Sequence, residues 1–267
     1  MNTDAVIHSE HYERIVMTAH LLAFLIGLSA THSLAGETLV LGVEDDAAPW
    51  SKKDGTGYAN ELVLALYQAA GVSVELKVLP YKRCKLLTVQ GRLVGCFNMA
   101  KIESLYDTIA FPSTPLFLEE VGYFHNVDEP LPVETEQDIP RGTTVGVVLG
   151  YEYTDTYYEL LENGTIEIEE SRSETSNLKK LAEGRIDTAI LVYNETKPAE
   201  AIIERAGATG EIGLSFKGKA LELHIGFSKA HPRGAVALAK YEQGIERILA
   251  DGTYDRITRK WAEKALE

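Results

Sequence analysis

Residues 144–193 read TVGVVLGYEYTDTYYELLENGTIEIEESRSETSNLKKLAEGRIDTAILVY. The apolar residues alternate between the two-residue repeat of a strand and the 3.6-residue repeat of a helix. This alternation predicts strands over 144–149, 165–169 and 186–193, separated by helices over 154–162 and 174–183. Helices between strands at this spacing indicate a parallel sheet with crossover helices.

An earlier part of the chain has the same plan. The pattern predicts strands over 38–43, 72–79 and 93–99, with helices over 60–70 and 81–90. LTVQGRLVGCF (87–97) and LAEGRIDTAI (181–190) also echo one another, because each places Gly-Arg between a helix end and an apolar strand. The sequence therefore predicts an α/β protein with two lobes of similar plan, each a mixed β-sheet flanked by helices.

The boundaries of the lobes follow from the segments between these patterns. Residues 125–142 carry three prolines and several acids, and we interpret them as a crossover between lobes. A last strand over 220–228 and helices over 234–250 and 253–266 return the chain to the first lobe. The expected domains are lobe 1, residues 36–125 plus 221–267, and lobe 2, residues 126–220. Ligands of open α/β sheets bind beyond the carboxyl ends of the strands, which places the site in a cleft between the lobes.

Residues 1–35 have the order of a secretory signal peptide. An apolar run over 16–30 follows Arg14 and leads into Ser33-Leu34-Ala35, a small-x-small site that predicts cleavage after Ala35. The segment before the run is acidic where a basic one is expected, so a later start at Met17 and an uncleaved anchor stay open as alternatives. We expect a periplasmic protein.

Composition and motifs exclude several functions. The chain has 267 residues and a formal net charge of −14, which argues against nucleic acid and against anionic membrane surfaces as partners. It has no Gly-x-Ser-x-Gly elbow, no His-Glu-x-x-His helix and no phosphate-binding loop. Beyond residue 35 the histidines are His125, His224 and His231, without the spacing of a metal motif. We therefore expect no enzyme, no metal and no cofactor.

Five motifs occur in an order and spacing that resemble a known family. They are GVEDDAAPW (42–50), VGVVLG (145–150), EGRIDTAIL (183–191), FSKAHP (227–232) and ADGTYDRITRKW (250–261). Together they resemble the extracellular solute-binding proteins of family 3, the periplasmic partners of polar amino-acid ABC transporters. The resemblance implies the type II two-lobe periplasmic-binding-protein fold. It also implies that the protein captures a small polar solute, amino-acid-like or cationic, by hinge closure and delivers it to an ABC permease.

Two other functions stay open at this point. A periplasmic sensor that passes its ligand to a membrane receptor would have the same sequence features. A cyclohexadienyl-dehydratase-like enzyme on the same fold is a more distant alternative, because fold does not determine function. In each case we expect a monomer, and the sequence does not identify the ligand.

The resemblance also implies positions for the ligand-binding site. The candidates are acidic, aromatic and polar groups that follow strands or begin helices: Glu44, Trp50, Tyr81, Asn98, Ala100, Lys101, Tyr151, Glu152, Tyr153 and Tyr193. Aromatic rings such as Trp50 and Tyr81 offer apolar area and a negative face for a cationic group. Packing in the core is the alternative for these two rings.

The chain departs from this family where relatives clamp an α-amino acid. Relatives carry an arginine for the ligand carboxylate at the position of Leu105, and an acid for its amino group at the position of Val192. We therefore predict that α-amino acids bind worse than about 100 μM. Either Lys101 serves as a replacement charge, or Glu44 and Glu152 form an acidic aromatic box for a cationic solute with Trp50 and the tyrosines. We favour the box; solvated positions for Lys101 and Glu152 at the rim are the alternative.

The chain has two cysteines, Cys84 and Cys96. A secreted protein can form a disulfide between them. A helix layer packs about 10 Å from a sheet, however, which is beyond the roughly 7 Å Cα separation that a disulfide spans. A bridge therefore requires the helix to lie unusually close to the strand, and two buried thiols are the alternative.

Overall fold

The computed structural model describes residues 38–265, so the predicted signal peptide, residues 1–35, lies outside the described part. Strands and helices alternate as the sequence predicts: β1 (Leu39–Glu44), α2 (Tyr58–Ala69), β4 (Val74–Leu79), α3 (Tyr81–Val89), β5 (Gly95–Ala100), β8 (Thr143–Val148), α4 (Asp155–Glu162), β9 (Ile166–Ser171), α5 (Glu174–Ala182), β10 (Thr188–Tyr193), β12 (Leu221–Ser228), α7 (Gly234–Ala250) and α8 (Thr253–Ala265). The predicted α/β fold class is confirmed.

The structure adds elements that the sequence patterns do not predict. They are β7 (Phe117–Asn126), α6 (Ala199–Ala206), β11 (Ile212–Lys217) and the short β2 (Asp46–Ala47), β3 (Ser51–Lys52), β6 (Ile109–Ala110), η1 (Glu103–Leu105) and η2 (Glu136–Asp138). The main sheet runs in the order β4-β1-β5-β12-β7-β10-β8-β9, with β6 paired to β12 and β11 paired to β7. We call β4, β1, β5, β12 and β6, with the helices and loops attached to them, the first sheet region. We call β10, β8, β9 and β11, with the helices and loops attached to them, the second sheet region.

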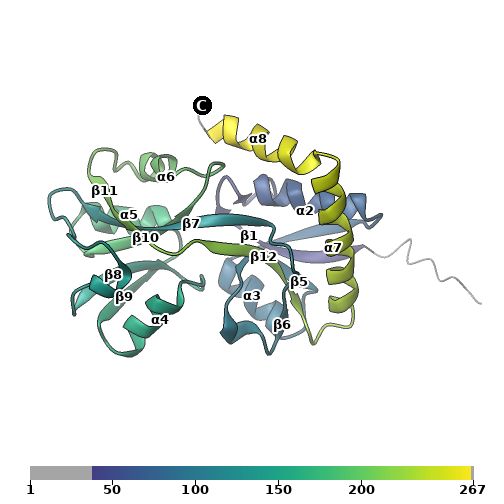
Figure 1. The fold of residues 1–267 in the computed structure, drawn as a ribbon, viewed down its shortest axis with the longest axis horizontal. Helices are drawn as coiled ribbons and strands as arrows, with labels where there is room; N and C mark the ends of the chain where they lie inside the picture. Colours follow the sequence, from purple (N-terminus) through teal and green to yellow (C-terminus); the bar gives the residue numbers. More distant parts are fainter. Residues whose placement is uncertain (1–37, 266–267) are drawn as a thin grey trace, which may run out of the picture. The chain divides into compact units, whose positions relative to one another are not determined.

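Strand β7 joins the two sheet regions. Its first residues, 117–119, pair with β12, and residues 120–124 pair with β10. Within each region the strands that precede or follow a crossover helix run parallel, as the alternation predicts: β1 with β4 and β5, and β8 with β9 and β10. Figure 1 shows β7 and β12 running between a group of elements around α3 and α7 and a group around α4 and α5. The predicted lobe boundaries stay a prediction, because pairing along β7 changes partner without a break.

Local sequence explains where the helices of the second region begin. Thr154 precedes α4 and its hydroxyl accepts a hydrogen bond from the backbone N–H of Tyr157. Ser173 does the same for Ser176 at the start of α5. These caps satisfy N–H groups that lack a partner in the first turn of a helix. The second cap matters for function, because it begins a helix whose first residue is the buried Glu174.

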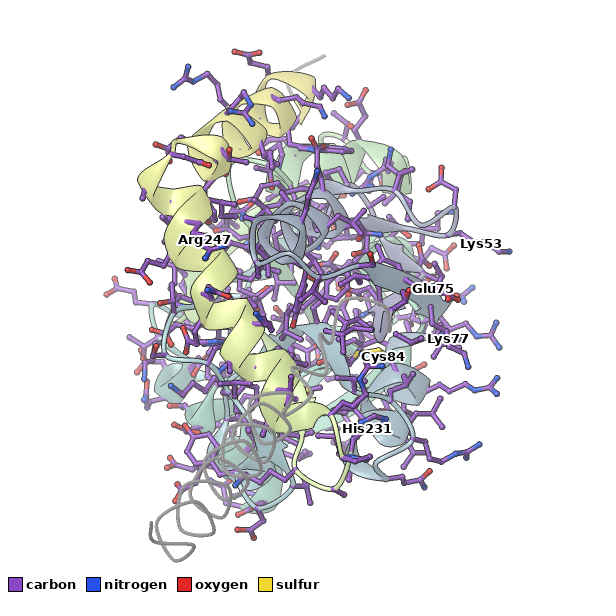
Figure 2. All side chains as sticks on the ribbon, turned by 90° about the vertical axis from the view of Figure 1, so that its right-hand side faces the viewer. Lys53, Glu75, Lys77, Cys84, His231 and Arg247 are labelled. Atoms are coloured by element: carbon purple, nitrogen blue, oxygen red, sulfur yellow. A yellow bond between two sulfur atoms is a disulfide. The ribbon has the colours of Figure 1, made fainter. Side chains whose placement is uncertain are left out.

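The structure contains a disulfide between Cys84 of α3 and Cys96 of β5, with a Cα separation of 5.9 Å. Gly42 of β1, which pairs with Cys96, explains how the helix comes so close to the sheet. A Cβ atom at position 42 would lie 2.4 Å from the sulfur of Cys84, so only glycine leaves room there. Cys84 is fully buried, whereas Glu75 and Lys77 of β4 are exposed, and Figure 2 shows these two side chains pointing outward.

We predict that this bond forms in the secreted protein. Intact mass after alkylation without reductant should show no modified cysteine, and reductant under denaturing conditions should add two alkyl groups. Because a closed loop restricts the unfolded chain, reduction should also lower the thermal midpoint. Two alkylated thiols in the untreated protein would contradict the bridge and restore the reading of two buried thiols.

Candidate functional site

The site begins where β1 and β5 end. These strands run in parallel with Gly42 level with Cys96, so Glu44, the last residue of β1, lies level with Asn98, which lies two residues before the end of β5. The Asn98 amide donates to Glu44 Oε1 (2.8 Å) and to Ser51 Oγ (3.1 Å). Asn98 has φ of 61°, a left-handed conformation that asparagine tolerates better than most residues. Its Oδ1 is buried and accepts no hydrogen bond among the described residues.

Glu44 is a buried carboxyl group with a perturbed pKa. Burial raises the pKa of Glu44 to about 7, and the hydrogen bonds from Asn98 and Tyr151 oppose this increase. The Tyr151 hydroxyl comes from the second sheet region and donates to Glu44 Oε2 at 2.7 Å. Lys197 lowers the pKa of Glu44 and Glu174 raises it. The group is therefore partly protonated near neutral pH.

Glu152 receives three hydrogen bonds from the first sheet region. The Tyr81 hydroxyl donates at 2.5 Å, Lys85 Nζ at 2.7 Å and the backbone N–H of Ala100 at 3.2 Å. Tyr81 also meets the Tyr151 ring edge-on, with centroids 5.2 Å apart. Glu152 thus connects the two regions, and its oxygens are occupied by protein donors.

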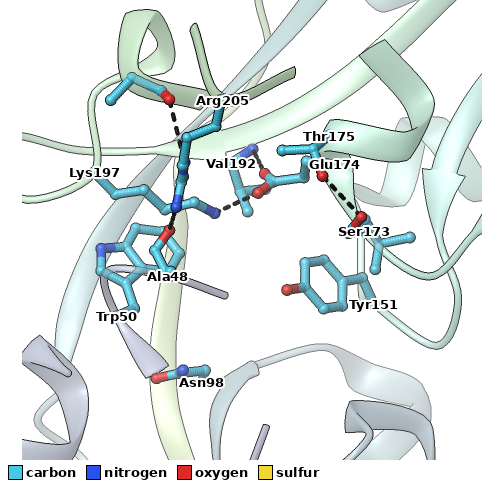
Figure 3. A network of polar contacts seen from close by, with 12 residues as sticks. Ala48, Trp50, Asn98, Tyr151, Ser173, Glu174, Thr175, Val192, Lys197 and Arg205 are labelled. Carbon is cyan, nitrogen blue, oxygen red and sulfur yellow. Dashed lines mark hydrogen bonds and ion pairs between the residues drawn. The ribbon is translucent and has the colours of Figure 1, made fainter. Parts of the chain in front are cut away.

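A second buried carboxylate forms an ion pair that sequence reasoning missed. Glu174 Oε2 lies 2.6 Å from Lys197 Nζ, and its Oε1 accepts from the backbone N–H of Val192. Both side chains are buried, and Lys197 Nζ lies 4.2 Å from the centre of the Trp50 ring. Figure 3 shows Lys197 between Trp50 and Glu174, and Trp50 on the far side of this ion pair from α5. A carboxylate thus reaches the backbone of Val192, the position where relatives carry an acid.

Trp50 is held from the second sheet region through its indole nitrogen. Nε1 donates to Thr196 Oγ1 (3.0 Å) and Asn194 Oδ1 (3.2 Å). Arg205 adds a bond from α6 to the carbonyl oxygen of Ala48, which Figure 3 also shows. Together with the bonds of Glu44 and Glu152, these contacts close the two regions on one another.

Glu119 is the other missed residue. It lies on β7 and is only 4% exposed. Burial raises the pKa of Glu119 well above its ordinary range, opposed by the nearby Lys197 and supported by Glu174, Glu44 and Glu152. Among residues 38–265 its carboxyl group forms no salt bridge and no hydrogen bond, whereas Glu152 and Glu174 are paired with lysines. The sequence gives no signal for this carboxyl group, because β7 follows two prolines and is not predicted as a strand.

These groups surround a small inner cavity. Its lining consists of Glu44, Trp50, Asn98, Ala100, Glu119, Tyr151, Glu152, Val192 and Leu223. It leaves about 10 Å³ in which the centre of a water-sized sphere can move, close to the smallest cavity that holds one water molecule. A larger outer pocket of about 550 Å³ lies next to it. Glu44 and Tyr151 line both, so their hydrogen bond separates the two spaces.

A groove of about 1040 Å³ along α2, α7 and α8 is larger than either space. It is an open surface groove, and the buried carboxyl groups without ion pairs do not line it. We therefore place the candidate site at the inner cavity and the outer pocket.

The structure brings seven of the ten predicted site residues together. Glu44, Trp50, Asn98, Ala100, Tyr151 and Glu152 line the inner cavity, and Tyr81 lines the outer pocket. Lys101 is exposed and lines neither space. Tyr153 is buried, and its hydroxyl accepts a hydrogen bond from the Val148 N–H. Tyr193 packs against Phe124, with centroids 6.1 Å apart. Contact of any of the ten with a solute stays a prediction.

Comparison with known proteins identifies the fold. No protein-family model matches the chain, and no curated protein matches it. Among solved structures, an ancestral arginine-binding protein bound to arginine has a TM-score of 0.71 at 20% identity, covering 85% of this chain and 99% of that one. A histidine kinase sensor domain with similarity to periplasmic binding proteins has the same TM-score and identity, covering 85% and 96%. An amino-acid ABC transporter substrate-binding protein from Streptococcus pneumoniae, bound to L-arginine, has a TM-score of 0.68 at 15% identity, covering 86% and 96%.

The fold is therefore that of the two-lobe periplasmic binding proteins, as the sequence motifs predict. Its structural neighbours include substrate-binding proteins of amino-acid ABC transporters. In the described part of the chain, no helix has both the length and the apolar character needed to cross a membrane. Between residues 38 and 265 no group of three or more His, Cys, Asp or Glu side chains is arranged to hold a metal ion.

Proposed function

We propose that this protein is a periplasmic solute-binding protein that captures a small cationic solute and delivers it to an ABC transporter. The observation that carries the proposal is the pair of carboxyl groups, Glu44 and Glu119, that line the inner cavity without an ion-pair partner. Glu152 and Glu174, by contrast, are neutralised by Lys85 and Lys197. A buried carboxylate is stable only when a positive charge or protons compensate it.

A cationic solute supplies the missing positive charge. Burial favours the protonated form of Glu44 and Glu119 in the protein alone, and a bound cation favours the ionised form of both. The aromatic rings of Tyr81 and Tyr151 add apolar surface beside the carboxyl groups. The Trp50 ring is different, because Lys197 already occupies one of its faces. We therefore propose the acidic aromatic box in a modified form, with Glu119 in the place of Glu152.

Capture would proceed by closure of the two sheet regions on the solute. The contacts of Glu44, Glu152 and Trp50 across the regions exist only when the regions are close. Strands β7 and β12 are the segments through which the chain passes between the regions, so they are the expected hinge. The lobes we propose are residues 36–125 plus 221–267, and residues 126–220.

Sensing is the second candidate function, and the likeness to a histidine kinase sensor domain favours it. A sensor and a transport protein bind the solute in the same way and differ in the membrane protein that they contact. Stimulation of a reconstituted permease by the loaded protein would support transport. Binding to a receptor without effect on a permease would support sensing.

We predict that a cationic solute raises the thermal midpoint in a screen of amino acids, amines, small acids and oligopeptides. A solute at about 100 times its Kd stabilises the folded state by about 2.7 kcal/mol. For a protein of this size the shift is about 5–10 °C. Turnover of any solute would favour the dehydratase-like alternative, and stabilisation by acids alone would contradict the cationic site.

A further inference from the structure

When Glu44 and Glu119 are ionised, the inner cavity offers acceptors and no free donors. Its unengaged oxygens are those of Glu119 and the buried Oδ1 of Asn98, while Glu44 oxygens have further lone pairs beyond the bonds from Asn98 and Tyr151. The donors that line the cavity are already used. The Asn98 amide and the Tyr151 hydroxyl donate to Glu44, and the Ala100 N–H donates to Glu152. Once Glu44 and Glu119 are ionised, an anion would find no donor there and both carboxylates would repel it.

The size of the cavity restricts the donor further. Space for the centre of one water-sized sphere matches a primary ammonium group, which is about as large as a water molecule. A primary ammonium has three N–H donors and no acceptor, as in lysine. The three acceptor residues, Glu44, Glu119 and Asn98, match this number. A guanidinium is a planar fork with five N–H donors and needs a wider space.

We propose that the inner cavity binds one primary ammonium group, and that the rest of the solute lies in the outer pocket. This inference rests on the proposed solute-binding function and names the chemical class of its ligand, an alkylamine. Asn98 is only 7% exposed, and its Oδ1 atom accepts one N–H of the ammonium group. Glu44 and Glu119 accept the other two.

The outer pocket accommodates the remainder of the molecule. Both signs of charge are present in its walls, which include Asp45, Asp46, Lys53, Lys82 and Arg172. A solute that occupies both spaces would displace the Tyr151 hydroxyl from Glu44, since these two residues line both spaces and their hydrogen bond separates them. An α-carboxylate at the ammonium end would meet Glu44 and Glu119, which repel it. The ammonium must therefore stand at the end of a carbon chain.

Calorimetry on three matched pairs tests the recognition of an ammonium against a guanidinium: butylamine and butylguanidine, 1,4-diaminobutane and 1,4-diguanidinobutane, ornithine and arginine. The primary amine should bind at least tenfold more tightly in each pair in which either member binds. Tighter binding of the guanidine member would overturn the inference and leave solute binding intact. A solute from the broad screen that binds without a primary ammonium would also overturn it. Failure of every solute in that screen would instead contradict the proposed function itself.

Two neighbouring variants isolate the role of the cavity carboxyl group. Glu119→Gln removes the carboxyl group that a bound cation would ionise and nearly keeps the shape of the side chain, and Glu120→Gln makes the same change on the exposed face of β7. The Kd of the preferred amine should rise about 10- to 100-fold in Glu119→Gln, the loss expected for one charge-assisted hydrogen bond. It should change less than twofold in Glu120→Gln. Because Glu119 makes no hydrogen bond among the described residues, Glu119→Gln should melt no lower than the parent protein. An unchanged Kd in a folded Glu119→Gln protein would overturn the inference.

Discussion

Replacing Lys197 with methionine is expected to lower the free energy of unfolding by about 3–5 kcal/mol, because it leaves the buried Glu174 carboxylate without its partner. Lys197 is fully buried, so no water replaces the lost ammonium. The side chain also loses its contact with the face of Trp50. Urea unfolding at pH 7.5 measures the change, and the thermal midpoint should fall by about 10 °C.

A surface ion pair provides the control for Lys197. Lys217 pairs with Glu120, and both side chains are about half exposed. Lys217→Met should cost less than about 1 kcal/mol, because water screens and replaces this pair. The double variant Lys197→Met, Glu174→Gln removes both charges and keeps an oxygen for the Val192 N–H. It should recover part of the loss, and a double variant less stable than Lys197→Met alone would contradict the explanation by an unpaired charge.

Replacing Glu44 with glutamine is expected to stabilise the protein alone at pH 8 by about 2–3 kcal/mol while weakening amine binding at least 30-fold. The pKa of Glu44 is about 7 in the folded protein and 4.5 in the reference state, so the folded protein holds a proton that the unfolded chain has lost between these values. Stability therefore falls as the pH rises from 4.5 to 7 and stays low above 7. Glutamine does not ionise, so the Glu44→Gln protein does not lose this stability as the pH rises.

The pH dependence separates this effect from simple repacking. Near pH 4.5 the carboxyl group is protonated in the folded protein and half protonated in the unfolded chain, so the two proteins should differ little in stability. In the parent protein the affinity for the amine should rise about tenfold from pH 6 to pH 8, as Glu44 loses its proton more readily. Urea unfolding and calorimetry at both pH values measure these changes. Glu75→Gln on the exposed edge strand β4 is the control for loss of one charge. A difference in stability between Glu44→Gln and the parent protein that does not change with pH would contradict the raised pKa of Glu44.

Sequence periodicity predicts the strands and helices that lie within a single sheet region, and it misses β7, which spans both regions. The residues of β7 follow Pro112 and Pro115, which argue against a central strand, and its two ends pair in different sheet regions. The prediction of a strand therefore needed the tertiary structure. The usual spacing between a helix layer and a sheet argues against the disulfide. This spacing does not apply here, because Gly42 has no side chain and lets α3 come closer to the sheet.

The candidate site divides in the same way. Glu44 and Asn98 lie at or near the carboxyl ends of neighbouring parallel strands, and such residues can be found from the pattern of strands alone. Lys197 lies in the loop NETKP, where a lone lysine is normally solvated. Its burial depends on Trp50 and Glu174, which lie about 150 and 20 positions away in the chain. A local sequence pattern cannot predict that residues so far apart in the chain come into contact.

The bond between Cys84 and Cys96 has a consequence for the entropy of binding. It ties the middle of α3, which presents Tyr81 and Lys85, to the strand that presents Asn98 and Ala100. These four residues therefore move as one piece, and their mutual arrangement is fixed when the chain folds. Pre-organised groups lose little conformational freedom when a ligand arrives, so more of the interaction energy appears as affinity.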